Sequence, residues 1–319
     1  MKLLSKDKKS KKEKDNKTKK QKDKTEVTKV EAKEAEEIVK PKKRKRVTYR
    51  KMVVDYWATS MHGEEIGIRQ DEQHRAKSRQ FSKDMDIYGA IKEGDEKIGF
   101  VGWRTEAWES GIDDEPEEEE GTILGPSTAE IGRLIIKSFS DESNWTGTLE
   151  EQPALELPRS YYKPLPVFTI LLPRYEYLIR IERIYTTTGN LYCTSLIVQE
   201  GKDKLKIMDM FEFDEKLFTF GSDWLIRRRG ANKKDIVAKL DGKVLNIGGK
   251  IVIKIFDKVL AKNREFRMVL TLFAAMLKYH DKVKNKVKEV RKQILKGEIQ
   301  IKPSNQELQL MRNPRSIRR

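Results

Sequence analysis

The chain has 319 residues, of which 37% are charged, 37% are hydrophobic and 8% are aromatic. Globular proteins contain about 25% charged and about 45–50% apolar residues, so we expect a sizeable part of this chain to lie outside any packed core. Residues 1–50 carry a net charge of +12 and residues 278–319 one of +9, whereas the region between them carries −5. The basic character therefore belongs to the two ends, which excludes a strongly basic body. The single cysteine, Cys193, excludes an internal disulfide framework.

Residues 1–46 are rich in Lys, Asp, Glu, Asn, Thr and Gln and contain no aromatic residue. Such a segment cannot bury enough apolar surface to offset the loss of chain entropy, so we predict a disordered basic arm. The arm ends in five consecutive cations, which are Lys42, Lys43, Arg44, Lys45 and Arg46. This run is a solvated linker or a contact for a polyanion, and in a cell with a nucleus it resembles a basic nuclear-import signal.

Residues 47–110 contain Trp57, Trp103 and Trp108 among short apolar clusters. Because tryptophan is costly to expose in number, we expect a small elaboration of helix and strand that docks on the main domain. The acidic run from Asp113 to Glu120 follows, and residues 121–166 hold five of the ten prolines. We predict that residues 111–166 are an acidic, proline-rich connector with little regular structure.

From residue 167 to residue 258 the sequence consists of short β-type runs separated by turns. Asp241-Gly242 is a strong hairpin signal, and Ile251, Ile253 and Ile255 fall on one face of a strand. Residues 266–277 are instead apolar on nearly every side, so a helix there must be buried over most of its surface. We predict a mainly β fold, a closed barrel or sandwich whose last element is a buried helix.

Two stretches in this region, KLFTFGSDWLI at 216–226 and IVAKLDGKVLNIGGKIVI at 236–253, together with the apolar helix, resemble the LURP-one-related proteins of the Tubby C-terminal superfamily. The resemblance covers about residues 167–280 and implies a closed barrel of about a dozen strands around a central helix at 266–280. The β-type runs are fewer than that, so residues 47–110 are the candidates to supply the remaining strands. The resemblance implies lipid binding or membrane association and no catalytic machinery, and we assign none of the family's lipid-contacting residues to a position in this sequence.

A basic patch surrounds the predicted turn at residues 230–232, and its members are Arg227, Arg228, Arg229, Lys233 and Lys234. Guanidinium and ammonium groups grouped at a turn can hold a phosphate-bearing headgroup or a nucleic-acid backbone, so this patch is our candidate ligand site. The alternative is a solvated hairpin turn. Because neighbouring residues of a strand point to opposite faces, the three arginines cannot all face one side.

Residues 281–298 form a predicted basic amphipathic helix with an apolar stripe made by Val283, Val287, Val290 and Ile294. Packing of this stripe on the body is the leading interpretation, and contact with a membrane, a nucleic acid or a protein partner is the alternative. The four arginines between Met311 and Arg319 belong to a tail that we expect to be disordered.

Sequence motifs for enzymes are missing: the chain has no GxxxxGK[ST], GxSxG or HExxH pattern, and His62, His74 and His280 have no partner that the sequence reveals. We therefore predict a protein that is not an enzyme and uses no metal and no cofactor. The predicted function is a binding or scaffold module that associates with anionic lipid headgroups. Nucleic-acid binding through the basic arms and a structural protein-interaction role are the alternatives. With no apolar run of the ~18 residues that a membrane span needs, we expect a cytoplasmic protein that associates peripherally with a membrane.

Overall fold

The computed structural model describes residues 46–55, 85–104, 127–200, 206–216, 223–232, 234–242, 250–303, 305 and 307–308. The chain divides into two units, residues 1–46 and residues 47–319, and the elements described below belong to the second unit. The expectations for the basic arm with Lys42 to Lys45, the acidic run, Trp57, Trp108, His62, His74, Lys233 and the arginine-rich tail concern residues outside those described.

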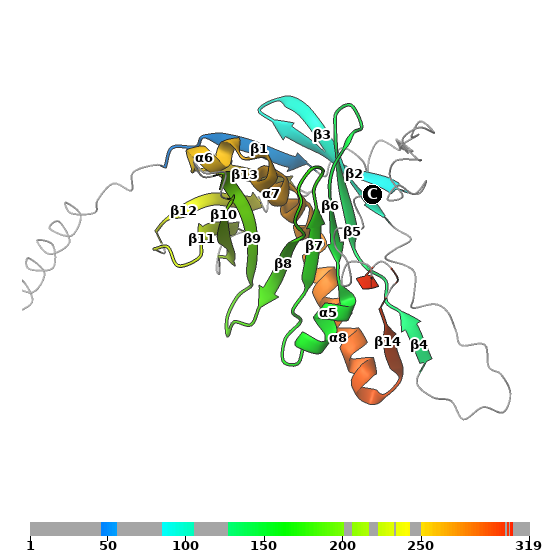
Figure 1. Cartoon of the computed structure of the whole chain (residues 1–319). Coiled ribbons are helices and arrows are strands. Elements are labelled where there is room, and N and C mark those ends of the chain that lie inside the picture. Colours follow the sequence, from blue (N-terminus) through cyan, green and yellow to red (C-terminus); the bar gives the residue numbers. More distant parts are fainter. Residues whose placement is uncertain are drawn as a thin grey trace, which may run out of the picture. The chain divides into compact units, whose positions relative to one another are not determined.

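Twelve antiparallel strands close into a barrel, in the order β1-β13-β12-β11-β10-β9-β8-β7-β6-β5-β3-β2 (Figure 1). Each strand pairs with the next barrel strand along the chain, with β3 pairing with β5 because β4 lies outside the barrel, and the ring closes where β1 pairs with β13. The prediction of a mainly β protein is therefore confirmed, as is the closed barrel. The strands are β1 (Arg50–Asp55), β2 (Met85–Glu93), β3 (Glu96–Arg104), β5 (Ile135–Ser140), β6 (Trp145–Glu151), β7 (Val167–Leu171), β8 (Ile179–Ile184), β9 (Leu191–Glu200), β10 (Lys206–Glu215), β11 (Asp223–Arg228), β12 (Ile236–Gly242) and β13 (Lys250–Ile255).

The barrel extends well beyond the segment that suggested it, because β1, β2, β3, β5 and β6 all precede residue 167. Residues 47–110 do supply three strands, as integral parts of the barrel instead of a docked elaboration. The expectation of a connector with little regular structure was wrong for residues 127–166, which hold β5, β6, the short strand β4 (Ser127–Glu130) and the helix α5 (Pro153–Arg159). The prolines lie at the boundaries of these elements: Pro153 is the first residue of α5, where its missing N–H breaks no hydrogen bond.

The helix α7 (Arg264–Leu277) lies where the apolar run predicts a helix, and nine of its fourteen residues are buried. It begins after Asn263, whose side-chain oxygen accepts the N–H of Phe266 at 2.6 Å and so caps the helix. The helix contacts β1, β5, β6, β9 and β13, which come from different parts of the ring order. The ring of Phe273 packs on Tyr192 and Trp224, with centroids 5.4 and 5.3 Å apart, so α7 and the strands share one hydrophobic core.

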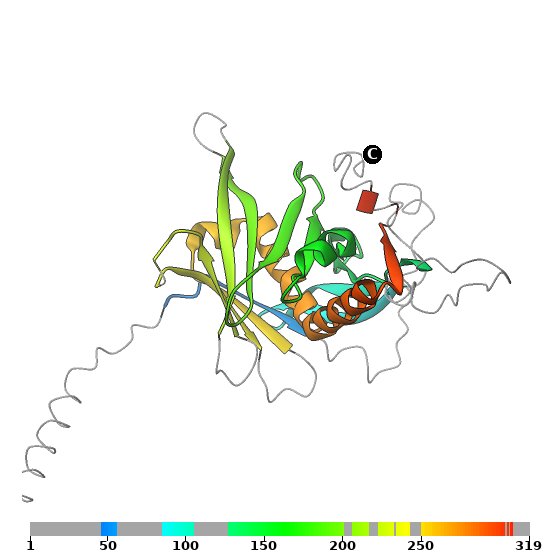
Figure 2. The same ribbon diagram turned by 90° about the horizontal axis from the view of Figure 1, so that it is seen from below.

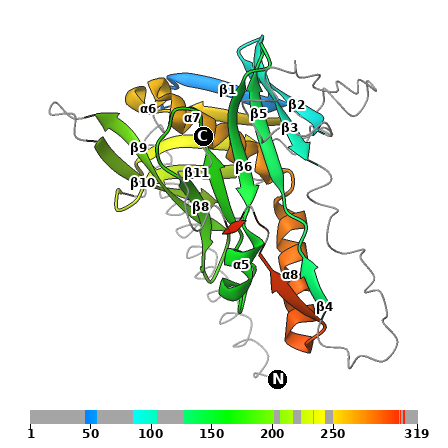
Figure 3. The ribbon, with the colours of Figure 1, turned by 45° about the vertical axis from the view of Figure 1, so that its right-hand side comes forward.

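A separate helix, α8 (His280–Lys296), follows α7 and holds most of the segment for which a basic amphipathic helix is predicted. A tight turn separates the two helices. In this turn the N–H of Tyr279 donates to the carbonyl of Met276, three residues earlier, at 2.8 Å. The predicted packing of the apolar stripe on the body is confirmed, because Val283, Val287 and Val290 are buried in the core. Figure 3 shows α8 beside β14 (Ile299–Lys302), which pairs in parallel with β4.

The last described helix, α6 (Lys258–Lys262), lies between β13 and α7 in the sequence. Figure 2 shows α6 and α8 beyond opposite ends of α7. Among the described residues, no helix is both long enough and apolar enough to pass through a lipid bilayer.

Candidate functional site

The three arginines of the predicted ligand site do not act as one cluster. Arg227 forms an ion pair with Asp214 at 2.6 Å, and Arg229 lies 3.9 Å from Glu212. Both acids lie on the face of β10 opposite to the face that carries the buried Phe211 and Phe213. Arg228 points the other way, as the alternation along a strand requires. The predicted turn is present, with Gly230 at a φ of 79°, and the structure places Lys234 as an exposed residue after this turn.

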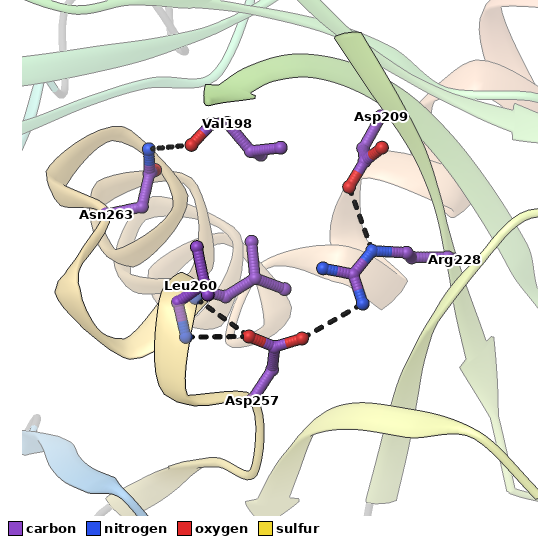
Figure 4. Close-up of polar contacts among 7 residues, drawn as sticks. Val198, Asp209, Arg228, Asp257, Leu260 and Asn263 are labelled. Carbon is purple, nitrogen blue, oxygen red and sulfur yellow. Dashed lines mark hydrogen bonds and ion pairs between the residues drawn. The ribbon is translucent and has the colours of Figure 1, made fainter. Parts of the chain in front are cut away.

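Arg228 joins two strands of the barrel to the helix α6. Its guanidinium contacts Asp209 at 2.8 Å and Asp257 at 2.9 Å (Figure 4). The second oxygen of Asp257 accepts the backbone N–H groups of Val259 and Leu260 at 2.8 and 3.0 Å, which makes this residue the N-cap of α6. One carboxylate therefore serves both as a helix cap and as an ion-pair partner.

The pKa values at this junction follow from these contacts. Burial tends to lower the pKa of Arg228, but the hydrogen bonds to Asp209 and Asp257 outweigh burial and raise it above its ordinary value. Burial likewise tends to raise the pKa of Asp257, and the N–H of Leu260 together with Arg228 lowers it. The charges on both groups are thus stabilised by the fold itself. An anionic ligand would have to displace carboxylates to reach Arg228.

The helix α6 is held on two further sides. The side-chain amide of Asn263 donates to the carbonyl of Val198 in β9 at 3.3 Å, as Figure 4 shows. The guanidinium of Arg50, at the start of β1, lies 3.4 Å from the carbonyl of Ala261. The end of the barrel around α6 is therefore tied to β1, β9 and β11.

Exposed aliphatic side chains gather on the elements joined at Arg228. Met208 is 55% exposed and Val259 is 53% exposed, and Ile207 and Met210 are exposed as well. In β10 these residues neighbour Asp209, which Arg228 links to α6, and by the alternation along a strand Met208 and Met210 lie on the face of β10 opposite Asp209. Three exposed cations accompany them on α6 and at the first residue of α7. We call this set the α6 surface, and its members are Ile207, Met208, Met210, Lys258, Val259, Lys262 and Arg264.

Positive charge also concentrates beside the α6 surface, where β1 approaches α7. The pKa of Arg267 is lowered, first by burial and then by the positive charges of Arg50 and Arg264. Arg50 itself pairs with Glu93 at 2.5 Å. These arginines are far apart in the sequence, and they meet because β1 pairs with β13, the strand that leads into α6. No local sequence pattern reveals this grouping.

A second group of ionisable side chains is buried where α8 meets the barrel. The ammonium of Lys286 donates to Glu151 and to the carbonyl of Gly132, at 2.7 and 2.6 Å. Glu156 accepts the N–H of Val167 at 2.9 Å. Burial, followed by the negative charge of Glu151, raises the pKa of Glu156 well above its usual range. These groups connect β6, α5 and α8, so we assign them a role in holding the elements together.

The remaining candidates from the sequence lie in the core. The structure gives His280 a partner that the sequence does not reveal, because its Nε2 lies 3.0 Å from the hydroxyl of Tyr192. Burial lowers the pKa of His280 to about 3. Cys193 is buried in β9, where burial raises its pKa. Within the described part of the chain, no group of three or more His, Cys, Asp or Glu side chains is placed to hold a metal ion.

Comparisons with known proteins identify no relative of this chain. No family model, no curated protein sequence and no solved structure matches it. The function therefore has to be inferred from the geometry of the two ends of the barrel.

Proposed function

We propose that this protein is a non-enzymatic module that binds peripherally to anionic membranes, with the α6 surface against the lipid headgroups. The observation that carries the proposal is that α6 and the first residue of α7 expose Val259 together with the cations Lys258, Lys262 and Arg264, while β10, which Arg228 ties to α6, exposes further aliphatic side chains. Aliphatic groups can enter the boundary between headgroups and acyl chains, about 5–10 Å deep, while cations remain at the phosphates. The ion pairs around Arg228 hold α6 and β11 together beneath this surface.

The size of the attraction indicates a reversible interaction. Each Lys or Arg near an acidic leaflet contributes about 1 kcal/mol, so Lys258, Lys262 and Arg264 together contribute about 3 kcal/mol. Full burial of an aliphatic side chain is favourable by about 1.5–3 kcal/mol, and roughly half of that remains available to a side chain that is half exposed. Association itself costs about 4 kcal/mol or more in lost translational and rotational freedom. The α6 surface alone therefore gives weak binding.

The basic arm supplies the additional attraction in this proposal. In the sequence, the run from Lys42 to Arg46 directly precedes Val47, and β1 follows at Arg50. The start of β1 contacts α6 through Arg50. In the sequence, the arm therefore directly precedes the strand whose first residue contacts α6. Its contacts with lipid are expected to be unspecific, whereas the α6 surface sets the orientation.

We also propose that the fold is of the Tubby type, with α7 as the central helix of the barrel. The closed ring of twelve antiparallel strands supports this proposal, together with the contacts of α7 to strands from different parts of the ring. A membrane-binding role fits such a fold. Arg227, Arg228 and Arg229 receive a structural role in place of the ligand-binding role first expected, because each lies beside an acid of its own chain.

Flotation of the full chain with vesicles tests the proposed function. Vesicles of phosphatidylcholine alone are compared with vesicles that contain phosphatidylserine, at ~0.15 M salt, where the Debye length is about 8 Å. The test variant replaces Lys258, Lys262 and Arg264 by alanine. A matched control removes the same charge from the exposed face of α8, at Lys282, Lys292 and Lys296.

We expect the test variant to lose about 10- to 100-fold in binding to the anionic vesicles, since three cations contribute about 3 kcal/mol before screening. The control variant should lose much less. Replacing Met208 and Val259 by serine should weaken binding without changing its dependence on salt. Equal losses in the test and control variants would show that only total charge matters, and would refute the α6 surface as the contact.

A further inference from the structure

Three exposed tyrosines form a group at the end of the barrel next to α8. Tyr161 and Tyr162 follow α5, and Tyr185 follows β8. Their exposed fractions are 61%, 78% and 56%. The rings of Tyr161 and Tyr162 have centroids 4.7 Å apart, and those of Tyr162 and Tyr185 have centroids 6.4 Å apart. Single exposed apolar residues need no explanation, but a contiguous exposed group marks an interaction site.

Cations are interleaved with these rings. The ammonium of Lys163 lies 5.6 Å from the ring centre of Tyr185, and the guanidinium of Arg291 lies 5.1 Å from the ring centre of Tyr161. Both distances are within the range of cation–π attraction. Lys163 also donates to the carbonyls of Thr186 and Thr187, at 2.8 and 2.7 Å. The two loops that carry the tyrosines are therefore fixed to each other, and Arg291 joins them to α8.

A row of basic residues leads away from the tyrosines along α8. Lys284, Lys288 and Arg291 are spaced four and three residues apart, which places them on one face of the helix. Lys284 is paired with the exposed Asp281 at 2.8 Å, so Lys288 and Arg291 supply most of the free positive charge of this row. This face lies beside the buried stripe, because Val287 packs in the core. The row spans about 10 Å at the rise of ~1.5 Å per residue of an α-helix. Residues 280–296 contain seven Lys and Arg against two acids.

We propose that this group, the tyrosine surface, binds single-stranded nucleic acid, with bases stacked on the tyrosine rings and phosphates on the basic row of α8. Stacking on an aromatic ring is available to every base, and cations beside the rings hold the backbone. The tyrosine surface comprises Tyr161, Tyr162, Lys163, Tyr185, Lys284, Lys288 and Arg291.

The combination of positive charge with exposed aromatic rings favours this occupant over others. A duplex keeps its bases stacked inside, so it could use the basic row but not the rings. The α6 surface differs in composition, since its apolar members are aliphatic and offer no face for stacking. Figure 2 shows α6 and α8 beyond opposite ends of α7, and Arg291 of α8 contacts the ring of Tyr161. The two surfaces share no residue, so the tyrosine surface can be tested separately from the proposed membrane contact.

Fluorescence anisotropy of a labelled oligothymidine with the full chain tests this inference. The basic arms bind any polyanion, but residues 1–46 contain no aromatic residue. Inorganic polyphosphate is therefore used as a competitor, because it binds to cations but cannot stack on aromatic rings. It separates the electrostatic contribution of the arms from the stacking contribution of the tyrosine surface. Wild type is expected to bind oligothymidine more tightly than polyphosphate of equal charge.

The decisive variants change the rings. Tyr162→Ala should weaken oligothymidine binding by about 5- to 100-fold, because base stacking on one ring contributes about 1–3 kcal/mol. Tyr162→Phe keeps the ring and should remain within about twofold of wild type. The control, Tyr177→Ala, alters a partly exposed tyrosine outside the tyrosine surface and should have no effect. Because Tyr162 is largely exposed, these variants are expected to fold.

Two results would overturn the inference. Wild-type affinity in the Tyr161→Ala and Tyr162→Ala variants would show that the arms alone hold the nucleic acid. Flotation with anionic vesicles that Tyr162→Ala abolishes, with oligothymidine binding unchanged, would assign the tyrosine surface to lipid. Loss of oligothymidine binding in the alanine variant and its retention in the phenylalanine variant would support stacking.

Discussion

The buried contact between Lys286 and Glu151 allows a sharp test of how α8 is held on the barrel. The side chain of Glu151 is fully buried and that of Lys286 is 8% exposed, with the two charged groups 2.7 Å apart. Replacing Lys286 by methionine keeps much of the side-chain volume but leaves a buried carboxylate without its cation. Removing one partner of a buried ion pair costs about 3–5 kcal/mol, so we expect a loss of that size in the free energy of unfolding at pH 7.

The loss should depend on pH with a definite sign. Lys286 lowers the pKa of Glu156, and burial and Glu151 raise it, so the variant should have a still higher pKa at this carboxyl. An acid whose pKa is higher in the folded state than in the unfolded state binds more protons when folded. Stability then falls as the pH rises above 4.5, the pKa of this carboxyl in the unfolded chain. The fall is up to about 1.4 kcal/mol per pH unit for one proton. The difference in the free energy of unfolding between the Lys286→Met variant and wild type should therefore be smaller at pH 5 than at pH 7.5.

Urea denaturation at pH 5 and pH 7.5, followed by circular dichroism, measures both effects. Lys288→Met removes an exposed lysine from the same helix and is expected to change stability by less than about 0.5 kcal/mol. A loss below about 1 kcal/mol for Lys286→Met at pH 7.5 would contradict the role assigned to this contact. An equal loss at the two pH values would contradict the coupling between Lys286 and Glu156.

Three further predictions concern single positions in the fold. Asp257→Ala removes the cap of α6 and should cost about 1–2 kcal/mol in urea denaturation, with little added by the partly exposed Arg228. Gly147→Ala places a methyl group 2.9 Å from a leucine that follows β7 and 3.1 Å from one in α7, so thermal melting should show a loss of about 1–3 kcal/mol from overpacking. Tyr192→Phe should cost about 1–2 kcal/mol because it removes the partner of His280, whose imidazole should show no titration by NMR between pH 5 and pH 8 in wild type.

Local patterns predict the elements whose residues are apolar in a regular order. The alternation of isoleucines identifies β13, and the all-round apolar run identifies α7. The strand β6 escapes such a prediction, because its buried positions include Thr148, Glu150 and Glu151. Their partners lie elsewhere in the chain: Arg133 contacts Glu150 at 2.7 Å, and Lys286 contacts Glu151. Hydropathy cannot indicate burial that depends on such distant partners.

The candidate site shows the same limit. A contiguous run such as Arg227 to Arg229 is easy to find, but the acids that neutralise it are on β10 and before α6. The α6 surface combines residues of β10 with residues that follow β13, and no spacing in the sequence relates them. Only the pairing of the strands and the Arg228 junction bring these segments together. The tyrosine surface likewise joins two loops to a helix that begins far later in the chain.

The closure of the barrel by β1 and β13 has a consequence for synthesis. Arg50 is paired with Ile255, so β1 can pair with β13 only after the ribosome has made about 200 further residues. At a rate of about 5–20 residues per second, that interval lasts about 10–40 s. Until then the nascent sheet has two unpaired edges, and such edges invite pairing with other chains. A chain released before β13 is made would keep both edges open, so premature termination should produce aggregates instead of a smaller soluble fragment.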